Sequence, residues 1–311
     1  VLNGLYPHDI GHYLGMDVHD TPLLSHNVVL QPGMVITVEP GAYVRRDFPI
    51  KNHIKAKEFL GAAVRIEDDV LITSDGPQSS SSLSITFCGR QKIGLTPLIC
   101  LLPSNERPAN PNKEPDAVLI IESNSSSPLP DHNTVLYVTD RDPFKEKWEG
   151  PVLGPDDAVG YLGVDEVMSL TVPGMYEYQL ESHFEHYCQM NGGQRLAFVP
   201  VVAGGERACH IHYTTNELKL NEGELVLLDG GVEYCGYVSD ITRTWPVNGR
   251  FTAAQRDLYE AVLRVKEACI KCCQVGVTLN YIHSVSKELL QEELKKLEIL
   301  PTDLDGPDLI Q

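Results

Sequence analysis

Three strongly apolar stretches of the chain each run into a carboxylate. The segment "VITVE" ends at Glu39, "VRIE" ends at Glu67 and "ELVLLD" ends at Asp229, and Asp240 follows Asp229 by eleven residues. Runs of β-branched and other apolar residues of this length favour buried strands. A carboxylate at the end of a buried strand is costly unless a cation or a proton neutralises its charge. We therefore expect the strands to gather these carboxylates around a shared positive charge.

Four gathered carboxylates carry four negative charges, which two divalent cations would balance. The segment "HDIGHYLGMDVHD" near the start of the sequence adds His8, His12 and His19. Of these, His12 would supply one neutral ring nitrogen. A single acid at a strand end is often an ordinary turn cap, so the hypothesis rests on the combination of acids and histidines. The sequence thus predicts a site for divalent metal ions.

Arginine is the other charged residue placed among the apolar strands. Side chains alternate along "VRIED", so Arg65 and Glu67 share one face of the predicted strand. We expect Arg65 to hold the carboxylates through a buried ion pair. The alternative is an arginine that faces the solvent.

The remaining pattern divides the chain into three regions, 1–75, 76–165 and 166–311. Residues 76–115 are rich in Ser, Pro and Asn, which is typical of a linker. Strands are predicted at 34–40, 62–73, 116–123 and 133–142, and helices at 174–193 and 252–273 and after Thr278. A hairpin within 224–245 is predicted to turn at Gly230–Gly231 and to bring Asp229 and Asp240 face to face.

Charge and composition exclude several classes of partner. The chain has 25 basic and 43 acidic residues, for a net charge of -18. An acidic surface repels phosphate backbones and anionic lipid, so we expect neither nucleic acid nor a membrane surface as a partner. No apolar run approaches the roughly 20 residues that span a bilayer.

The cysteines are interpreted as core residues. Cys269 and Cys272 fall at helical steps from Leu258, Val262 and Val265, which is the pattern of a buried helix face. A reducing compartment follows from this interpretation.

Five motifs together resemble a known family. They are "PHDIGHYLGMDVHD", "TVEPGAY", "RIEDD", "LLDGG" and "YVSDITRTWPVNGRFT". They are similar to the aminopeptidase P group of the pita-bread metallopeptidases, and most similar to its mitochondrial Xaa-Pro aminopeptidase 3 type. The resemblance implies an α+β catalytic fold, with a curved antiparallel sheet covered by helices. Residues 1–75 would form its second half and 166–311 its first half, while 76–165 would hold a linker and a partial N-terminal-type domain.

The resemblance also implies the roles of individual residues. It implies two divalent metal ions, most commonly Mn²⁺, with Asp240 and Glu67 bridging them and these residues as ligands: Asp229, Asp240, His12, Glu39 and Glu67. Glu39 would carry a proton, and His212 and His19 would contact the substrate and stabilise the tetrahedral intermediate. Further substrate contacts would come from His8, Arg65 and Phe198. Phe198 stands where relatives carry a tyrosine, which puts the fine positioning of substrate in doubt. For His210 we expect a plain surface position.

The order of the motifs departs from the family pattern. In the family the two aspartates come first, whereas here His12, Glu39 and Glu67 precede them. Joining the C-terminal end to the N-terminal end restores the family order, which predicts a circularly permuted chain with Val1 close to Gln311. The N-terminal-type domain is also shorter than in the family, and a partial domain with exposed strand edges is prone to aggregation.

The predicted activity is removal of the N-terminal residue from peptides that have proline at the second position. The alternatives are an Xaa-Pro dipeptidase, which would share the ligands, and an inactive truncated or misassembled member of the family. The expected partners are such peptides, a homodimer is allowed, and the expected location is mitochondrial or cytoplasmic.

Overall fold

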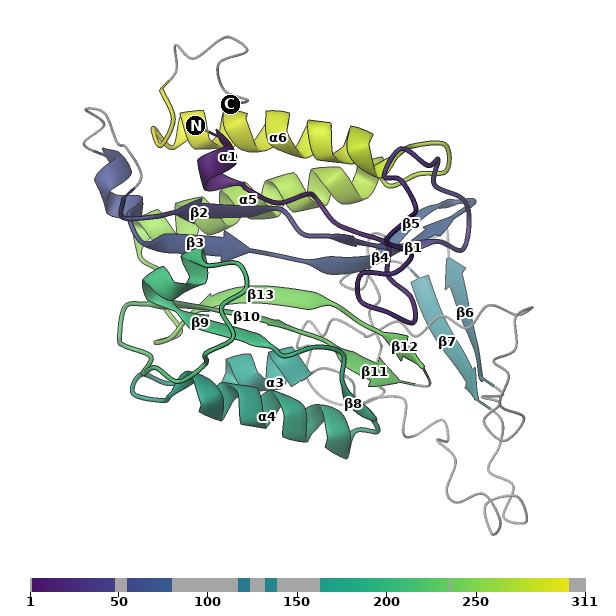
Figure 1. The fold of residues 1–311 in the computed structure, drawn as a ribbon, viewed down its shortest axis with the longest axis horizontal. Coiled ribbons are helices and arrows are strands. Elements are labelled where there is room, and N and C mark those ends of the chain that lie inside the picture. Colours follow the sequence, from purple (N-terminus) through teal and green to yellow (C-terminus); the bar gives the residue numbers. More distant parts are fainter. Residues whose placement is uncertain are drawn as a thin grey trace.

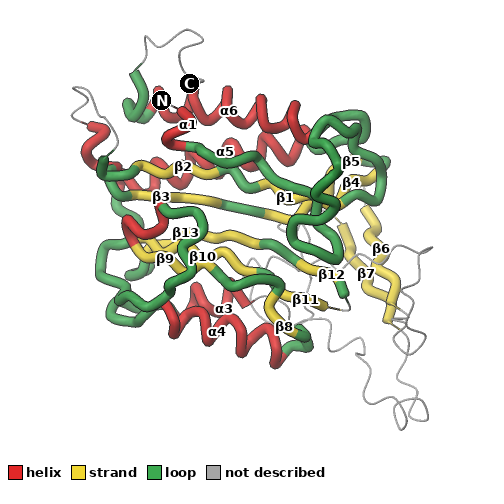
Figure 2. Tube along the Cα trace, viewed as in Figure 1, coloured by secondary structure: helices red, strands yellow, loops and turns green. Residues whose placement is uncertain are grey.

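The computed structural model describes residues 2–47, 55–79, 117–123, 132–138, 163–234 and 236–301. We call residues 2–79 the N-terminal segment and residues 163–301 the C-terminal segment. Every strand pair in the described ranges is antiparallel. Strands lie in the middle of the molecule, with helices on two opposite outer sides (Figures 1 and 2). This arrangement confirms the predicted α+β class.

The N-terminal segment supplies one side of the strand layers. Its strands pair in the orders β1-β4-β5 and β2-β3. Its elements are α1 (Leu2–Leu5), β1 (Val35–Val38), β2 (Gly41–Val44), a 3₁₀ turn (Lys55–Phe59), β3 (Ala62–Arg65), β4 (Asp68–Thr73) and β5 (Gly76–Ser79).

The C-terminal segment supplies the other side of the strand layers and the helices α3, α4, α5 and α6. Its strands pair in the orders β13-β10-β9 and β12-β11-β8. Its elements are α3 (Gly163–Leu170), α4 (Glu177–Met190), β8 (Arg195–Leu196), β9 (Val201–Gly204), a 3₁₀ turn (Gly205–Cys209), β10 (Leu225–Gly230), β11 (Val232–Tyr234), β12 (Tyr237–Val238), β13 (Ile241–Pro246), α5 (Ala253–Cys272) and α6 (Leu279–Lys296).

The predicted helix starts are confirmed by their caps. The Thr252 hydroxyl accepts a hydrogen bond from the Gln255 main-chain N–H (3.2 Å), and the Gln255 side chain accepts one from the Thr252 N–H (2.9 Å). The Thr278 hydroxyl accepts from the N–H of Tyr281 at 3.2 Å. These bonds satisfy donors that the first helical turn leaves unpaired.

The predicted strand over residues 62–73 is two strands. The chain leaves the β3 ladder at Ile66, and the Glu67 main-chain N–H donates to the carbonyl of Thr242 at 3.1 Å. This bond takes Glu67 out of both neighbouring ladders. The residue therefore lies in a break between β3 and β4, where its side chain can point into the space between the strand layers.

The predicted hairpin turn at Gly230–Gly231 is wrong in position. β10 pairs with β13 as far as Gly230 opposite Ile241, and the hairpin then continues as β11 and β12. Gly231 marks a close approach instead. A Cβ added there would lie 1.8 Å from the carbonyl oxygen of Ser239. Glycine permits this close approach of the two strands, because it has no Cβ.

Two helix pairs cover the two outer sides of the strand layers. α5 contacts β1, β2, β3 and β5, whereas α4 contacts β8 and β9 and α3 contacts β13. The largest buried cluster joins both segments, from Leu2 and Ile36 to Leu258 and Leu300. Cys269 is fully buried, as predicted, and Cys272 is partly buried.

The middle region of the chain contributes one described hairpin. β6 (Ala117–Ser123) pairs with β7 (His132–Val138) along its whole length. The predicted boundary at residue 165 falls inside α3, whose Val164 and Val167 share a buried cluster with Phe184 of α4. The predicted linker of residues 76–115 is wrong at its start, because residues 76–79 form β5 and pair with β4. The rest of that linker and the predicted proximity of Val1 and Gln311 lie outside the described residues.

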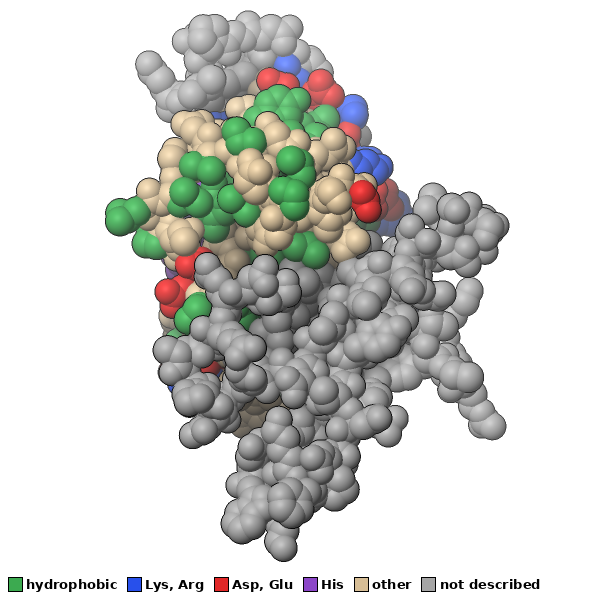
Figure 3. All heavy atoms as spheres, turned by 90° about the vertical axis from the view of Figure 1, so that its right-hand side faces the viewer, with side chains coloured by type: hydrophobic (Ala, Val, Ile, Leu, Met, Phe, Trp, Pro, Cys, Tyr) green, Lys and Arg blue, Asp and Glu red, His purple; other side chains and the backbone are tan. Residues whose placement is uncertain are grey.

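Figure 3 shows the molecule from the side of β4 and β5. The upper part of the described surface there carries mostly hydrophobic and other uncharged side chains, with charged side chains along its edge. The loop before β1 is joined there to the α5–α6 connection, because the Leu30 N–H donates to the Val277 carbonyl at 2.8 Å.

Every helix in the described ranges is too short or too polar to span a bilayer.

Replacing Leu258 with alanine should lower the free energy of unfolding by about 2–5 kcal/mol, because it opens a cavity in the cluster that joins the two segments. Urea denaturation of the metal-free protein measures this change. Leu218 is 50% exposed, so Leu218→Ala is the matched control and should cost about 0.5 kcal/mol or less. Equal losses in the two variants would contradict the packing of α5.

Candidate metal centre

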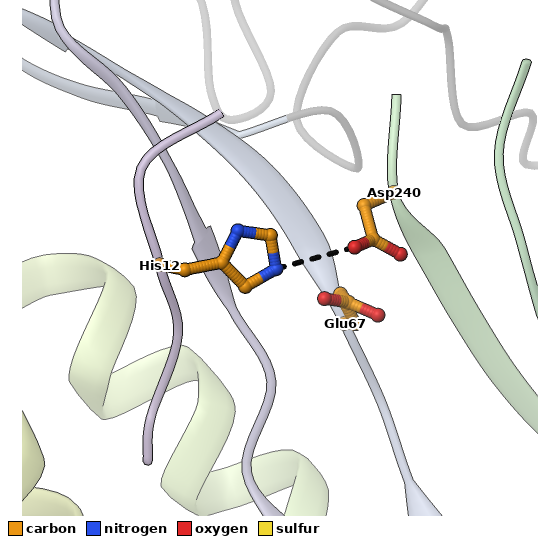
Figure 4. A group of neighbouring side chains, drawn as sticks. All are labelled: His12, Glu67 and Asp240. Carbon is orange, nitrogen blue, oxygen red and sulfur yellow. Dashed lines mark ion pairs between the residues drawn. The ribbon is translucent and has the colours of Figure 1, made fainter. Parts of the chain in front are cut away.

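Three side chains from separate parts of the sequence converge between the strand layers. His12 lies in the loop after α1, Glu67 in the break between β3 and β4, and Asp240 directly before β13 (Figure 4). One ligand atom from each lies within 4.8 Å of the other two. Nε2 of His12 is 3.2 Å from Oδ2 of Asp240. Both carboxylates are buried, with Glu67 1% and Asp240 5% exposed.

The loop that carries His12 runs alongside β1 and fixes Glu39 as well. The Thr37 N–H donates to the His12 carbonyl (2.9 Å), and the Glu39 N–H donates to the Ile10 carbonyl (2.7 Å). A Cβ on Gly11 would lie 2.0 Å from the Thr37 carbonyl oxygen, so only glycine permits this approach. As a result, Oε1 of Glu39 lies 3.6 Å from Nε2 of His12 and accepts a hydrogen bond from the Thr37 hydroxyl at 3.2 Å.

Arg65 connects Asp229 to the same group. Its guanidinium is 2% exposed and pairs with the Asp229 carboxylate. Its Nε donates to the Thr242 hydroxyl at 3.1 Å, and that hydroxyl donates to Oε2 of Glu67 at 2.6 Å. Arg65 therefore forms the buried ion pair, and the solvent-facing alternative is wrong. It touches Glu67 through Thr242 rather than directly.

The polar atoms of the group fit a divalent cation. Oε1 of Glu67 and Oδ1 of Asp229 are buried without a hydrogen-bond partner. Nδ1 of His12 lies 3.1 Å from the Tyr13 carbonyl, so that nitrogen is the donor and Nε2 presents its lone pair to Asp240. Two acceptors 3.2 Å apart require a proton or a metal ion between them. Carboxylate oxygens with one imidazole are the donor set that suits Mn²⁺ and similar ions.

Burial controls the protonation of these groups. Burial, opposed by Arg65 and assisted by Asp229, raises the pKa of Glu39 to about 7. Burial and the neighbouring carboxylates raise the pKa of Glu67 and of Asp240 well above the ordinary range. Burial lowers the pKa of His12 to about 4, so its ring is neutral at physiological pH. A neutral imidazole is the form that binds metal ions.

The other predicted site residues differ in their contacts and in their exposure. The ring of His19 is exposed and stacks edge-on against His12, with 4.5 Å between the ring centroids. Nε2 of His8 is 2.8 Å from the Tyr43 hydroxyl, and burial lowers the pKa of His8 to about 3. His212 is exposed, and its charge contributes to the lowered pKa of His8. Phe198 is half-buried.

His210 is exposed, as predicted. Three polar residues of the site were not predicted from the sequence: Thr37, Tyr43 and Thr242. Tyr43 accepts a hydrogen bond from Nη1 of Arg65 at 2.9 Å. Thr37 and Thr242 each lie two residues from a predicted ligand, so strand alternation places them on the same face. That spacing was the signal that could have found them.

Comparison with known proteins gives matches over both segments. The model of metallopeptidase family M24 matches residues 2–74 and 158–301, and the model of the aminopeptidase P N-terminal domain matches residues 112–184. Xaa-Pro aminopeptidase 3 of Rattus norvegicus is 33% identical over 281 residues, which cover 62% of this chain and 56% of that protein. The mitochondrial intermediate cleaving peptidase 55 of Arabidopsis thaliana is 46% identical over 121 residues, covering 39% of this chain and 24% of that protein.

A solved structure of an Escherichia coli aminopeptidase P variant in complex with substrate is 36% identical, with a TM-score of 0.43. The match covers 45% of this chain and 32% of the chain in that structure. The chain spans about half the length of the curated Xaa-Pro aminopeptidase 3 proteins that it matches. The family match covers most of the chain and includes all five predicted ligands, and it confirms the resemblance and the pita-bread fold class inferred from the motifs. The chain belongs to metallopeptidase family M24.

Proposed function

We propose that this chain is a metal-dependent aminopeptidase that removes the N-terminal residue from peptides with proline at the second position. The observation that carries the proposal is the buried group of His12, Glu67 and Asp240 in a chain of family M24. The substrate class is supported by the relatives named Xaa-Pro aminopeptidase. An Xaa-Pro dipeptidase would use the same kind of site, so peptide length is the property that distinguishes the two activities.

The proposed site holds two divalent metal ions, with Mn²⁺ as the expected metal. The ligands would be Asp229, Asp240, His12, Glu39 and Glu67, and Asp240 and Glu67 would bridge the two ions. Divalent ions at such a site supply Lewis-acid activation of water near neutral pH. The ion pair with Arg65 fixes the direction of the Asp229 carboxylate.

Glu39 is the proposed proton carrier. Its pKa of about 7 in the metal-free protein suits a group that takes up and releases protons near neutral pH. The hydrogen bond from Thr37 fixes one of its oxygens. Glu39 would take a proton from the attacking water and deliver it to the proline nitrogen, which leaves as an amine. Of the histidines, His19 and His212 are exposed and therefore accessible to a peptide, and with His8 they would orient it.

The permuted order and the location are further proposals. The two segments matched by the family M24 model flank the segment matched by the N-terminal domain model, which supports a rearranged order. The mitochondrial relative supports a mitochondrial location. A homodimer stays a prediction.

Mn²⁺ should raise the melting temperature of the protein and support release of the first residue from an Xaa-Pro-Xaa tripeptide. Ions at about 100 times their dissociation constant stabilise the folded state by about 2.7 kcal/mol. Asp240→Ala should abolish both effects, because a bridging ligand contacts both ions. Asp257→Ala, at a position on α5 where the side chain is 43% exposed, is the control and should abolish neither. Thermal melting and peptide analysis by mass spectrometry measure the outcome.

Glu39→Gln should keep measurable Mn²⁺ binding and lose turnover. The substitution removes the carboxylate that carries the proton but leaves the other four proposed ligands in place. A parent protein that cleaves only Xaa-Pro dipeptides would support the dipeptidase. A parent that shows neither response to Mn²⁺ nor cleavage would support an inactive chain. An Asp240→Ala variant that still responds and cleaves would refute the ligand assignment.

The metal-free protein should lose stability as the pH rises from about 6.5 to about 8. The pKa of Glu39 is raised from 4.5 to about 7, so the folded state binds more protons than the unfolded chain in this range. The lowered pKa values of His8 and His12 have the opposite effect, which fades as the pH rises above their ordinary value of 6.5. The raised pKa values of Glu67 and Asp240 act in the same direction as that of Glu39. Urea denaturation at several pH values measures the slope, which Glu39→Gln should reduce. A stability that increased with pH in this range would contradict the protonated state of the group.

A further inference from the structure

The two segments meet along a seam at the metal centre. The seam consists of residues 65–69 on one side and residues 240–244 on the other. β4 and β13 belong to different sheets, so contacts between side chains and main chain join them here. The Thr244 hydroxyl donates to the Arg65 carbonyl at 2.9 Å, and Oδ2 of Asp69 accepts from the Asp240 N–H at 3.3 Å.

A buried ionic triad of Asp68, Arg243 and Lys266 lies directly behind this seam. Nη2 of Arg243 donates to Oδ1 of Asp68 at 2.8 Å, and Nζ of Lys266 donates to Oδ2 at 2.6 Å. The exposed fractions are 0%, 9% and 5% for Asp68, Arg243 and Lys266. Lys266 comes from α5, whereas the other two residues come from the strands on the two sides of the seam.

Arg243 also binds the main chain on both sides. Its Nη1 donates to the Glu67 carbonyl at 2.5 Å and to the Thr242 carbonyl at 3.0 Å. The Thr242 hydroxyl in turn donates to Oε2 of Glu67. The Arg243 guanidinium thus binds the main chain at Glu67 and at Thr242, the residue whose hydroxyl binds the Glu67 carboxylate.

The two oxygens of Asp68 are bound by two different cations, Oδ1 by Arg243 and Oδ2 by Lys266. Burying an ammonium carries a desolvation cost, which the bond to Asp68 offsets in part. With both oxygens of Asp68 bound, the carboxylate cannot rotate. Arg243 is then held in one orientation.

We propose that Lys266 is a positioning residue for the metal centre, an inference that rests on the proposed function. Its ammonium fixes Asp68, and Asp68 fixes the guanidinium of Arg243. That guanidinium sets the main chain at Glu67 and with it the direction of the Glu67 carboxylate. Outer partners of metal ligands typically change metal affinity or activity by about 10- to 100-fold when they are lost.

The test compares the unsubstituted 311-residue chain with three variants: Lys266→Met, Lys266→Arg and Lys271→Met. Methionine keeps the length of the side chain and removes its charge, whereas arginine keeps the charge. Lys271 is exposed on the same helix, so Lys271→Met is the control for a lost charge on α5. The readouts are the dissociation constant of Mn²⁺ by calorimetry on the folded protein, KM and kcat on an Xaa-Pro-Xaa peptide, and the melting temperature of the metal-free protein.

Lys266→Met should weaken Mn²⁺ binding and lower kcat by about 10-fold or more, with KM little changed because the residue does not touch the peptide. Lys266→Arg should restore most of the loss, and Lys271→Met should match the parent. A Lys266→Met protein with a lower melting temperature but the parent Mn²⁺ affinity and kcat would overturn the proposal, because a purely structural link predicts that result.

Asp68→Asn provides the second route if Lys266→Met does not fold. It keeps the shape of the side chain and should weaken Mn²⁺ binding in the same way, and an unchanged affinity would overturn the proposal. A parent that neither binds Mn²⁺ nor cleaves the peptide would instead refute the proposed function itself. The two failures are therefore distinguishable.

Discussion

The hydrogen bond from the Glu67 N–H to the Thr242 carbonyl is the contact on which the site depends. It holds Glu67 in the break between β3 and β4 and attaches it to β13, the strand that begins beside Asp240. The N-terminal and C-terminal segments thus meet at the residues of the candidate metal centre. A site built in this way depends on packing between segments and not on their order in the chain, because its side chains meet in space.

Electrostatics makes this meeting point costly when it is empty. Glu39, Glu67, Asp229 and Asp240 face one another in a buried region where Arg65 provides a compensating guanidinium. Desolvation and mutual repulsion favour bound protons on some of the carboxyl groups, as the raised pKa values indicate. The rest of the local structure limits this cost, since the hydroxyls of Thr37 and Thr242 each donate to a carboxylate oxygen.

Much of the fold followed from local patterns. The helix caps at Thr252 and Thr278 were predicted because a side-chain oxygen and the first helical N–H groups are neighbours in sequence. The strand ends were less predictable. The break at Glu67 depends on its hydrogen bond to Thr242, and the close approach at Gly231 depends on the position of Ser239. Thr242, the partner of Glu67, is remote in sequence, and the local hydrophobic pattern carries no information about which remote residues come into contact.

The sequence by itself determined which residue types could form the site: apolar strands that end on carboxylates, histidines close together near the start, and an arginine among them. These are properties of composition and alternation, which act over a few residues. Only the tertiary structure decided that Arg65 pairs with Asp229 rather than Glu67, and that Thr242 lies between them. It also placed Lys266 of α5 behind the site. These partners are chosen by the packing of two segments against each other, and that packing depends on the whole buried core.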